Sequence, residues 1–158
     1  MDLTLYARQL CGLYSKDKLE AFRDLCNSTN DRLIVFYNFT AELALMLEYV
    51  PLDRNRSFVN GERKDLDAYE SEDNSITFVQ YQAGAMGLNL QKANKIIYFT
   101  PPERCELWMQ SQKRIHRIGQ DKPCFYYKMI CTNSVEEHIY KALERGVDFT
   151  DELFRKEI

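Results

Sequence analysis

The feature that most constrains the fold of this chain is a set of short, unbroken apolar runs. Leu33–Tyr37 reads LIVFY, and Ile76–Val79 and Lys95–Phe99 are similarly rich in β-branched and aromatic residues. A strand with alternating apolar and polar side chains can leave one face in water, whereas an unbroken apolar strand has to be covered on both faces. Layers of helices on either side of a parallel sheet provide that cover. The runs therefore predict a parallel sheet between two helical layers.

The segments between these runs have helical patterns. Ser15 is predicted to cap a helix that reaches about Asn27, since serine is a favoured N-cap residue. Thr40 is predicted to cap a second helix, which Pro51 ends because proline has no backbone N–H to donate. Ser134 opens the sequence Ser-Val-Glu-Glu, which has the capping-box pattern and predicts a third.

The remaining predicted elements are a weaker strand at Arg56–Asn60, a short helix around Lys64–Tyr69, a helix from about Glu103 to Ile118, a strand at Phe125–Cys131 and a last short helix within Phe149–Ile158. Strands alternate with helices, and the connections are too long for hairpins. We therefore predict a single α/β domain over residues 1–158, with three layers and a mainly parallel sheet.

Composition excludes several classes of protein. No run of eighteen apolar residues is present, so no membrane span is predicted, and the N-terminus lacks the pattern of a signal peptide. We expect a cytoplasmic, intracellular protein. The five cysteines include no CxxC pair, and His116 and His138 have no partner at ligand spacing. Neither a disulfide framework nor a metal site is therefore predicted.

The charges are unevenly distributed, although the formal net charge is only −3. Residues 62–75 contain six acidic and two basic side chains, and residues 92–128 contain eight basic and three acidic ones. A solvated surface is the commonest reason for such a charge run. The asymmetry nevertheless puts the positive charge around the segment with the most distinctive motifs.

Gln110, Arg114 and Arg117 follow one another at i, i+4 and i+7 in the predicted helix. They form a polar stripe beside an apolar one, which consists of Leu107, Trp108, Ser111, Ile115 and Ile118. An arginine fork binds phosphate oxygens through two parallel hydrogen bonds. Because charged helix faces are common, spacing alone favours an ordinary exposed surface over a phosphate site.

Gly84 and Gly87 lie in a loop, residues 82–90, that follows the predicted strand Ile76–Val79. Glycines allow backbone N–H groups to approach a phosphate or a sugar closely. A tight connection within the sheet explains the pair equally well. The GxxxxGK[ST] phosphate loop is absent from the chain, as are the common hydrolase signatures GxSxG and HExxH.

Three segments together resemble the helicase motifs of Swi/Snf-type ATPases, which belong to helicase superfamily two. RLIVFYNFTAELALML resembles motif IV (near 33–40), QAGAMGLNLQKA resembles motif V (82–90), and QSQKRIHRIGQ resembles motif VI (110–120). The ending RIHRIGQ is the most specific part. The likeness spans roughly residues 33–143, and the compact form is most similar to phage or prophage members.

The resemblance implies a RecA-like domain of the P-loop NTPase type, the second of two in the parent enzyme. ATP and Mg²⁺ would bind between the two domains, with the Walker A and Walker B motifs supplied by the N-terminal one. Arg117 would be the arginine finger and Arg114 a second phosphate contact. Gln110, Gly87 and Asn89 would lie at the ATP-binding interface. This chain alone is expected to be inactive and to bind neither ATP nor Mg²⁺ tightly.

The resemblance also implies a nucleic-acid surface, with DNA, in duplex form, as the expected partner. Its residues would be Asn38, Thr40, Gln82, Ala83 and Gly84. At Gln80 and Tyr81 the family often has serine or threonine. Contacts of this kind are made to the backbone and are largely independent of base sequence.

Two other hypotheses stay open on the sequence alone. The chain could be a free-standing nucleic-acid-binding or regulatory module that has kept the fold without the motor. It could also be half of a DEAD-box-like RNA helicase. The specific sequence RIHRIGQ and the absence of an aspartate from GLNL disfavour that hypothesis.

Overall fold

The sheet of this protein has six strands in the order β3-β2-β4-β1-β5-β6. The computed structural model describes residues 3–84 and 87–157. The strands are β1 (Leu33–Tyr37), β2 (Arg56–Val59), β3 (Lys64–Asp65), β4 (Ile76–Gln80), β5 (Lys95–Tyr98) and β6 (Phe125–Lys128). All neighbouring strands are parallel except β3, which pairs antiparallel with β2. The predicted α/β fold with a mainly parallel sheet is confirmed.

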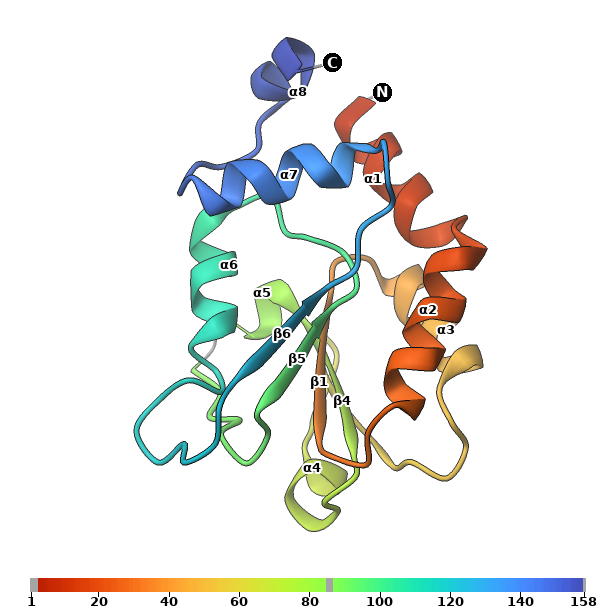
Figure 1. Ribbon diagram of the computed structural model, residues 1–158, viewed down its shortest axis with the longest axis vertical. Helices are drawn as coiled ribbons and strands as arrows, with labels where there is room; N and C mark the ends of the chain where they lie inside the picture. The colour runs from red at the N-terminus through yellow and green to blue at the C-terminus, as the bar shows by residue number, and fades with distance from the viewer. Residues whose placement is uncertain (1–2, 85–86, 158) are drawn as a thin grey trace.

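Helices cover both faces of this sheet (Figure 1). They are α1 (Leu3–Leu13), α2 (Lys16–Asn27), α3 (Thr40–Tyr49), α4 (Asp67–Ser71), α5 (Tyr81–Gly84), α6 (Cys105–Gln112), α7 (Val135–Glu144) and α8 (Asp151–Glu157). Side chains of α2 and α3 share one core cluster with the sheet, and side chains of α6 and α7 share the other. The arrangement has three layers, as predicted.

Strand β1 explains why the LIVFY run contains no polar residue. Ile34 and Phe36 point into the cluster with α6 and α7, while Leu33, Val35 and Tyr37 point into the cluster with α2 and α3. All five side chains are buried. A charged side chain in this strand would lose its hydration in the core.

The ends of two helices test the capping predictions. Ser15 caps α2 as predicted, since its hydroxyl accepts a hydrogen bond from the backbone N–H of Lys18 at 3.2 Å. The prediction for Thr40 is wrong. Phe39 is the N-cap, and the Glu42 carboxylate accepts from the backbone N–H groups of Asn38 and Phe39, each at 2.9 Å. The helix therefore begins without a side-chain cap, and a carboxylate in its first turn accepts from the N–H groups that precede it.

Two predicted helices have different bounds in the structure. The segment around Lys64–Tyr69 begins with the short strand β3, and the helix α4 follows it. Helix α6 ends at Gln112 instead of continuing to Ile118, whose side chain is 99% exposed and does not face the sheet. The chain turns away because the carbonyl of Arg114 accepts a hydrogen bond from the backbone N–H of Leu90 at 2.9 Å.

Helix α1 lies outside the segment that resembles a known family, but it is integrated into the fold. It packs against α3, α7 and α8. Arg8 forms an ion pair with Glu103 at 2.5 Å, and this pair joins α1 to the segment after β5. None of the helices in the described parts of the chain has the length and apolar character that crossing a membrane requires.

Candidate functional site

Two arginines meet at one backbone carbonyl in the turn that follows α6. Arg114 Nη1 donates to Leu88 O at 3.3 Å, and Arg117 Nη1 donates to the same oxygen at 3.4 Å. Leu88 belongs to the glycine-containing loop after α5. The structure therefore brings together the two segments that resemble motifs V and VI.

The two guanidinium groups differ in exposure. Arg114 is 7% exposed, and among the described residues its Nε has no hydrogen-bond partner. Burial, followed by the charge of Arg117, lowers the pKa of Arg114. Arg117 is exposed. Two like charges held at one carbonyl oxygen repel each other, so an anion arriving beside them would be stabilised.

The loop that contains Leu88 is anchored in the core by two leucine side chains. Leu88 and Leu90 are buried, while Gly87 and Asn89 are exposed. Gly87 has a φ of 81°, in the left-handed region that favours glycine. Residues 85 and 86 of this predicted loop lie outside the described residues. Its first part, which we predicted as loop, forms the short helix α5.

Gln120 connects the end of the turn after α6 to the residues that follow Leu90, a role that the sequence analysis missed. Its Nε2 lies 3.2 Å from Gln91 O, 2.8 Å from Ala93 O and 3.1 Å from Ile115 O. Gly119, with a φ of 100°, turns the chain so that the amide can reach them. The position of Gln120 at the end of RIHRIGQ was the available signal.

Gln110 does not share a helical face with the arginines, because α6 ends between them. Its Nε2 donates to Glu106 Oε1 at 3.2 Å, on the preceding turn of α6. Its Oε1 is buried and has no hydrogen-bond partner within residues 3–84 and 87–157. The predicted stripe of three residues is therefore divided between a helix and a turn.

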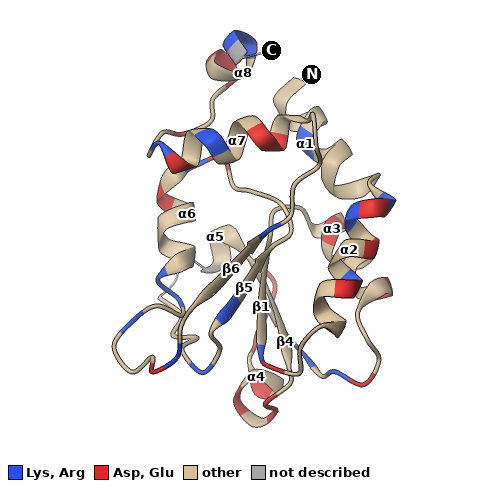
Figure 2. Ribbon diagram, viewed as in Figure 1, with Lys and Arg blue, Asp and Glu red and all other residues tan. Residues whose placement is uncertain are grey.

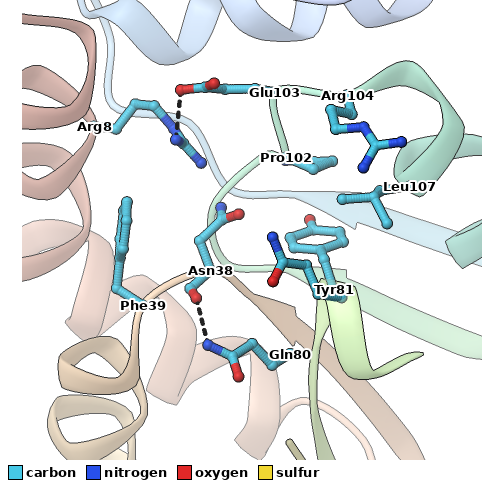
Figure 3. A pocket seen from close by; sticks show the side chains of 10 residues that line it. Arg8, Asn38, Phe39, Gln80, Tyr81, Pro102, Glu103, Arg104 and Leu107 are labelled. Atoms are coloured by element: carbon cyan, nitrogen blue, oxygen red, sulfur yellow. Dashed lines mark hydrogen bonds and ion pairs between the residues drawn. The ribbon is translucent and has the colours of Figure 1, made fainter. Parts of the chain in front are cut away.

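A crevice of about 200 Å³ opens at the carboxyl ends of β1 and β4 (Figure 3). Ligands of parallel α/β sheets commonly bind at this edge. The lining residues are Arg8, Asn38, Phe39, Gln80, Tyr81, Gln82, Pro102, Glu103, Arg104 and Leu107.

Two of the predicted nucleic-acid residues, Asn38 and Gln82, line this crevice, and Gln82 is exposed. Thr40 is exposed at the start of α3, and Ala83 packs against the core. The residues that line the crevice do not include Thr40, Ala83 or Gly84, the last residue of α5.

Asn38 is held in place by its own chain. Its Nδ2 donates to Thr100 Oγ1 at 3.0 Å and to Pro101 O at 2.7 Å. Its backbone carbonyl accepts from Gln80 Nε2 at 2.8 Å, the bond drawn between β1 and β4 in Figure 3. Asn38 therefore ties three strand ends together at the floor of the crevice.

Tyr81 occupies a position where the family often has a small hydroxyl residue. Its ring is stacked on Phe36, with the centroids 5.2 Å apart, and its hydroxyl donates to Thr100 O at 2.6 Å. Burial raises the pKa of Tyr81 well above its ordinary value. This hydroxyl is committed to the interior, so a phosphate contact from it is not available.

The crevice also contains charged residues that the sequence analysis did not select. Arg8 pairs with Glu103 at 2.5 Å, and Arg104 pairs with Glu106 at 2.8 Å. Glu103 and Arg104 follow β5, so the rule that sites lie after strand ends could have found them. Arg8 had no such signal, because α1 precedes the first strand.

The acidic and basic segments lie partly against each other (Figure 2). Lys92 pairs with Glu70 of α4 at 2.5 Å, and Arg32 pairs with Asp73 at 3.3 Å. One ion pair therefore joins the two segments directly, and Asp73 of the acidic segment is paired with an arginine outside both. Arg117 is exposed in the turn after α6, whereas the two arginines of the crevice, Arg8 and Arg104, are each paired with a glutamate.

Glu42 is expected to make stability depend on pH. Its buried Oε2 has no hydrogen-bond partner in the described part of the chain, and burial raises the pKa of its carboxyl group despite the bonds from Phe39, Asn38 and Thr100. The folded state then keeps the proton at pH values where the unfolded chain has lost it. The contribution of Glu42 to stability should therefore decrease as the pH rises above about 4.3, the ordinary glutamate value.

Urea unfolding between pH 4 and pH 8 tests this expectation. Glu42→Gln keeps an oxygen that can accept from Asn38 and Phe39 but cannot ionise, so its stability relative to the native chain should increase over the same range. Parallel pH profiles for the two proteins would show that Glu42 makes no such contribution.

Comparisons with known proteins agree with these observations. Residues 17–119 match the family of helicase conserved C-terminal domains. The chain is 27% identical over 165 residues to the ATP-dependent helicase fft1 of Schizosaccharomyces pombe, covering 96% of this chain and 16% of that protein. A DNA repair and recombination protein RAD54-like of Drosophila yakuba is 32% identical over 120 residues, covering 70% of this chain and 15% of that protein.

A solved structure has the same fold. The crystal structure of the C-terminal part of the Fun30 ATPase domain superposes with a TM-score of 0.72 at 24% identity, covering 78% of this chain and 44% of that one. The chain spans about a sixth of the length of these two curated relatives. Coming from fission yeast and a fruit fly, they give no support to a phage-like form. The match over residues 17–119 shows that this chain belongs to the family of helicase conserved C-terminal domains.

Proposed function

We propose that this chain is the C-terminal motor domain of a Swi/Snf-type, DNA-dependent ATPase that acts as a helicase or translocase. The observation that carries the proposal is the meeting of Arg114 and Arg117 at the Leu88 carbonyl. It supports a phosphate-binding site made from a glycine-containing loop and two cations, without a phosphate loop in the chain itself. The N-terminal RecA-like domain of the parent protein is the proposed partner.

Arg117 is the proposed arginine finger, since its guanidinium group is exposed while one N–H is fixed on Leu88 O. A guanidinium has five N–H donors, so several can turn toward phosphate oxygens while that bond persists. The positive charge would stabilise the transferring phosphoryl group.

Arg114 is the proposed second phosphate contact. Its bond to Leu88 O holds the loop, and its Nε, which has no hydrogen-bond partner among the described residues, is a donor left for a phosphate oxygen. Gly87 and Asn89 are exposed on this loop, where a nucleotide or the other domain could reach them. We place Gln110 at the same interface.

ATP with Mg²⁺ is the proposed ligand of the complete enzyme. The residues described here fit the phosphate part of that ligand through their cationic donors. The acidic ligands of Mg²⁺ are proposed to come from the N-terminal domain, as the resemblance to Swi/Snf-type ATPases implies.

The crevice at the ends of β1 and β4 is the proposed path of the DNA backbone. Gln82 offers an exposed side-chain amide, and Asn38 positions the strand ends below it. Thr40, Ala83 and Gly84 would contribute contacts beside the crevice. Amide donors bind phosphate and sugar oxygens without reading bases, as a motor that moves along DNA requires.

Gln82→Glu in the full-length enzyme should weaken its use of DNA. A carboxylate at the crevice would repel the DNA phosphates, and we expect the DNA concentration for half-maximal ATPase stimulation to rise about tenfold, or about 1.4 kcal/mol. Titration of ATPase activity with duplex DNA measures this. Asn30→Asp, the same change of charge at an exposed site near the amino end of β1, is the control. An equal effect of both variants would contradict the proposed path.

The proposal is tested by comparing the full-length protein with this chain. We expect the 158-residue chain to show no Mg²⁺-dependent ATP turnover, and the full-length protein to be stimulated by duplex DNA more than by RNA. Turnover by the chain alone would overturn the two-domain site. Preferential stimulation by RNA would favour a DEAD-box-like enzyme, and a parent without any ATPase activity would favour a free-standing binding module.

A further inference from the structure

Two cysteines from opposite ends of the chain lie together where α1 meets the segment before α7. Cys11 is on α1, and Cys131 is in the segment between β6 and α7, which runs upward beside α1 in Figure 1. The sulfur atoms of Cys11 and Cys131 and a carboxylate oxygen of Glu136 all lie within 4.8 Å of one another. The Cys131 thiol also donates to Cys11 O at 3.6 Å.

A metal ion is a poor occupant of this cluster. Both Glu136 oxygens already bind Lys18 Nζ, each at 2.6 Å, and Oε1 also accepts from the backbone N–H of Cys131 at 2.9 Å. The ammonium group therefore already neutralises the carboxylate that a metal ion would need. What remains beside it is a pair of thiols without a metal-binding carboxylate.

The pair is accessible to small molecules. Both cysteines are half-buried, and Cys131 lines an open groove of about 1020 Å³ between α2 and β6. The hydrogen bond from Cys11 and the nearby charge of Lys18 lower the pKa of Cys131 to about 7, although burial opposes them. The bond with Cys131 and burial raise the pKa of Cys11. Cys131 is thus the better nucleophile at neutral pH.

We propose that Cys11 and Cys131 form a redox modification site, at which a small-molecule disulfide such as oxidised glutathione converts the two thiols into one disulfide. The Cys131 thiolate attacks one glutathione sulfur, forming a mixed disulfide and releasing one glutathione thiolate. Cys11 then gives up its proton and attacks Cys131 Sγ, releasing the second glutathione. The protein loses two electrons and two protons, and the oxidant is reduced to two glutathione thiols.

The bond would fasten α1 to the last third of the chain. A disulfide requires the sulfurs to approach to about 2.05 Å, which side-chain rotation has to supply from the observed separation. Arg8 lies one helical turn before Cys11 and lines the crevice at the strand ends. Oxidation therefore fixes the helix that presents this arginine. The inference depends on the cysteine pair alone and does not rest on the proposed ATPase role.

The test uses the 158-residue chain treated with oxidised glutathione and digested with trypsin without reduction. We expect the intact mass to fall by about 2 Da, since two hydrogens leave. The peptides Gln9–Lys16 and Met129–Lys141 should appear linked. The temperature of half-unfolding should rise, and added dithiothreitol should reverse all three changes.

Cys11→Ser and Cys131→Ser should each abolish the linked peptide, whereas Cys124→Ser, a half-buried cysteine elsewhere, should leave it unchanged. Cys11→Ala is a second variant, with circular dichroism to confirm folding of each. A lasting glutathione adduct on Cys131 without the link would overturn the proposal. So would a link formed as readily to Cys124, or no reaction at all.

Discussion

Arg117→Ala in the full-length ATPase is expected to reduce DNA-stimulated turnover by about 10³- to 10⁵-fold, the range for loss of an arginine finger. The exposed guanidinium would be the group that meets charge developing on the transferring phosphate. The loss should appear in kcat, because this interaction strengthens only as the reaction proceeds. Steady-state ATPase assays at saturating duplex DNA measure it.

Three comparisons make the result specific for Arg117. DNA affinity, measured by fluorescence anisotropy, should change little, because Arg117 does not line the crevice. Lys113→Ala removes an exposed cation from the same turn and should leave turnover nearly intact. Arg117→Lys keeps the charge but loses the planar fork, so it should restore only part of the activity. Parallel loss of DNA binding and turnover in Arg117→Ala would contradict the assignment.

Lys18→Met is expected to lower the free energy of unfolding by about 3–5 kcal/mol, the usual cost of removing one partner from a buried ion pair. Lys18 is 5% exposed and Glu136 is 1% exposed. Methionine can still pack against Phe99, over which the ammonium lies at 5.2 Å. The Glu136 carboxylate, however, would stay buried with its charge unpaired. Urea unfolding measures the difference in the free energy of unfolding.

The controls separate burial from pairing. Lys92→Met breaks an equally short pair with Glu70, in which both side chains are about half exposed, and should cost less than about 1 kcal/mol. Lys18→Met combined with Glu136→Gln removes both charges and keeps an acceptor for the Cys131 N–H, so most of the stability should return. Equal losses in Lys18→Met and Lys92→Met would show that burial does not decide the cost.

Several features of this protein follow from local sequence. The unbroken run Leu33–Tyr37 determined a strand with both faces covered, because a strand without polar side chains gains most by leaving water entirely. Ser15 determined where α2 begins, since its hydroxyl accepts a hydrogen bond from the backbone N–H of Lys18. The ending RIHRIGQ identified the family later shown by residues 17–119.

Other local patterns were misleading because contacts outside the pattern competed with them. The apolar periodicity predicted that α6 continues to Ile118. The helix ends at Gln112, and the Arg114 carbonyl accepts instead from the backbone N–H of Leu90. At the start of α3 the competing group is local, because Glu42 in the first turn accepts from the N–H groups of Asn38 and Phe39; only its bond from Thr100, at 3.0 Å, is long-range. A helical pattern records one face of one segment and cannot include such partners.

The sequence by itself determined that helices cover both faces of the sheet. It also determined which segments carry the charges and the glycines. Only the tertiary structure decided that Arg114 and Arg117 share the carbonyl of Leu88, and that Arg8 meets Glu103 across 95 residues. The sheet order places β4 beside β1 and β1 beside β5, so residues distant in the chain meet at their ends. Those neighbours are set by the packing of the whole core, which no single segment encodes.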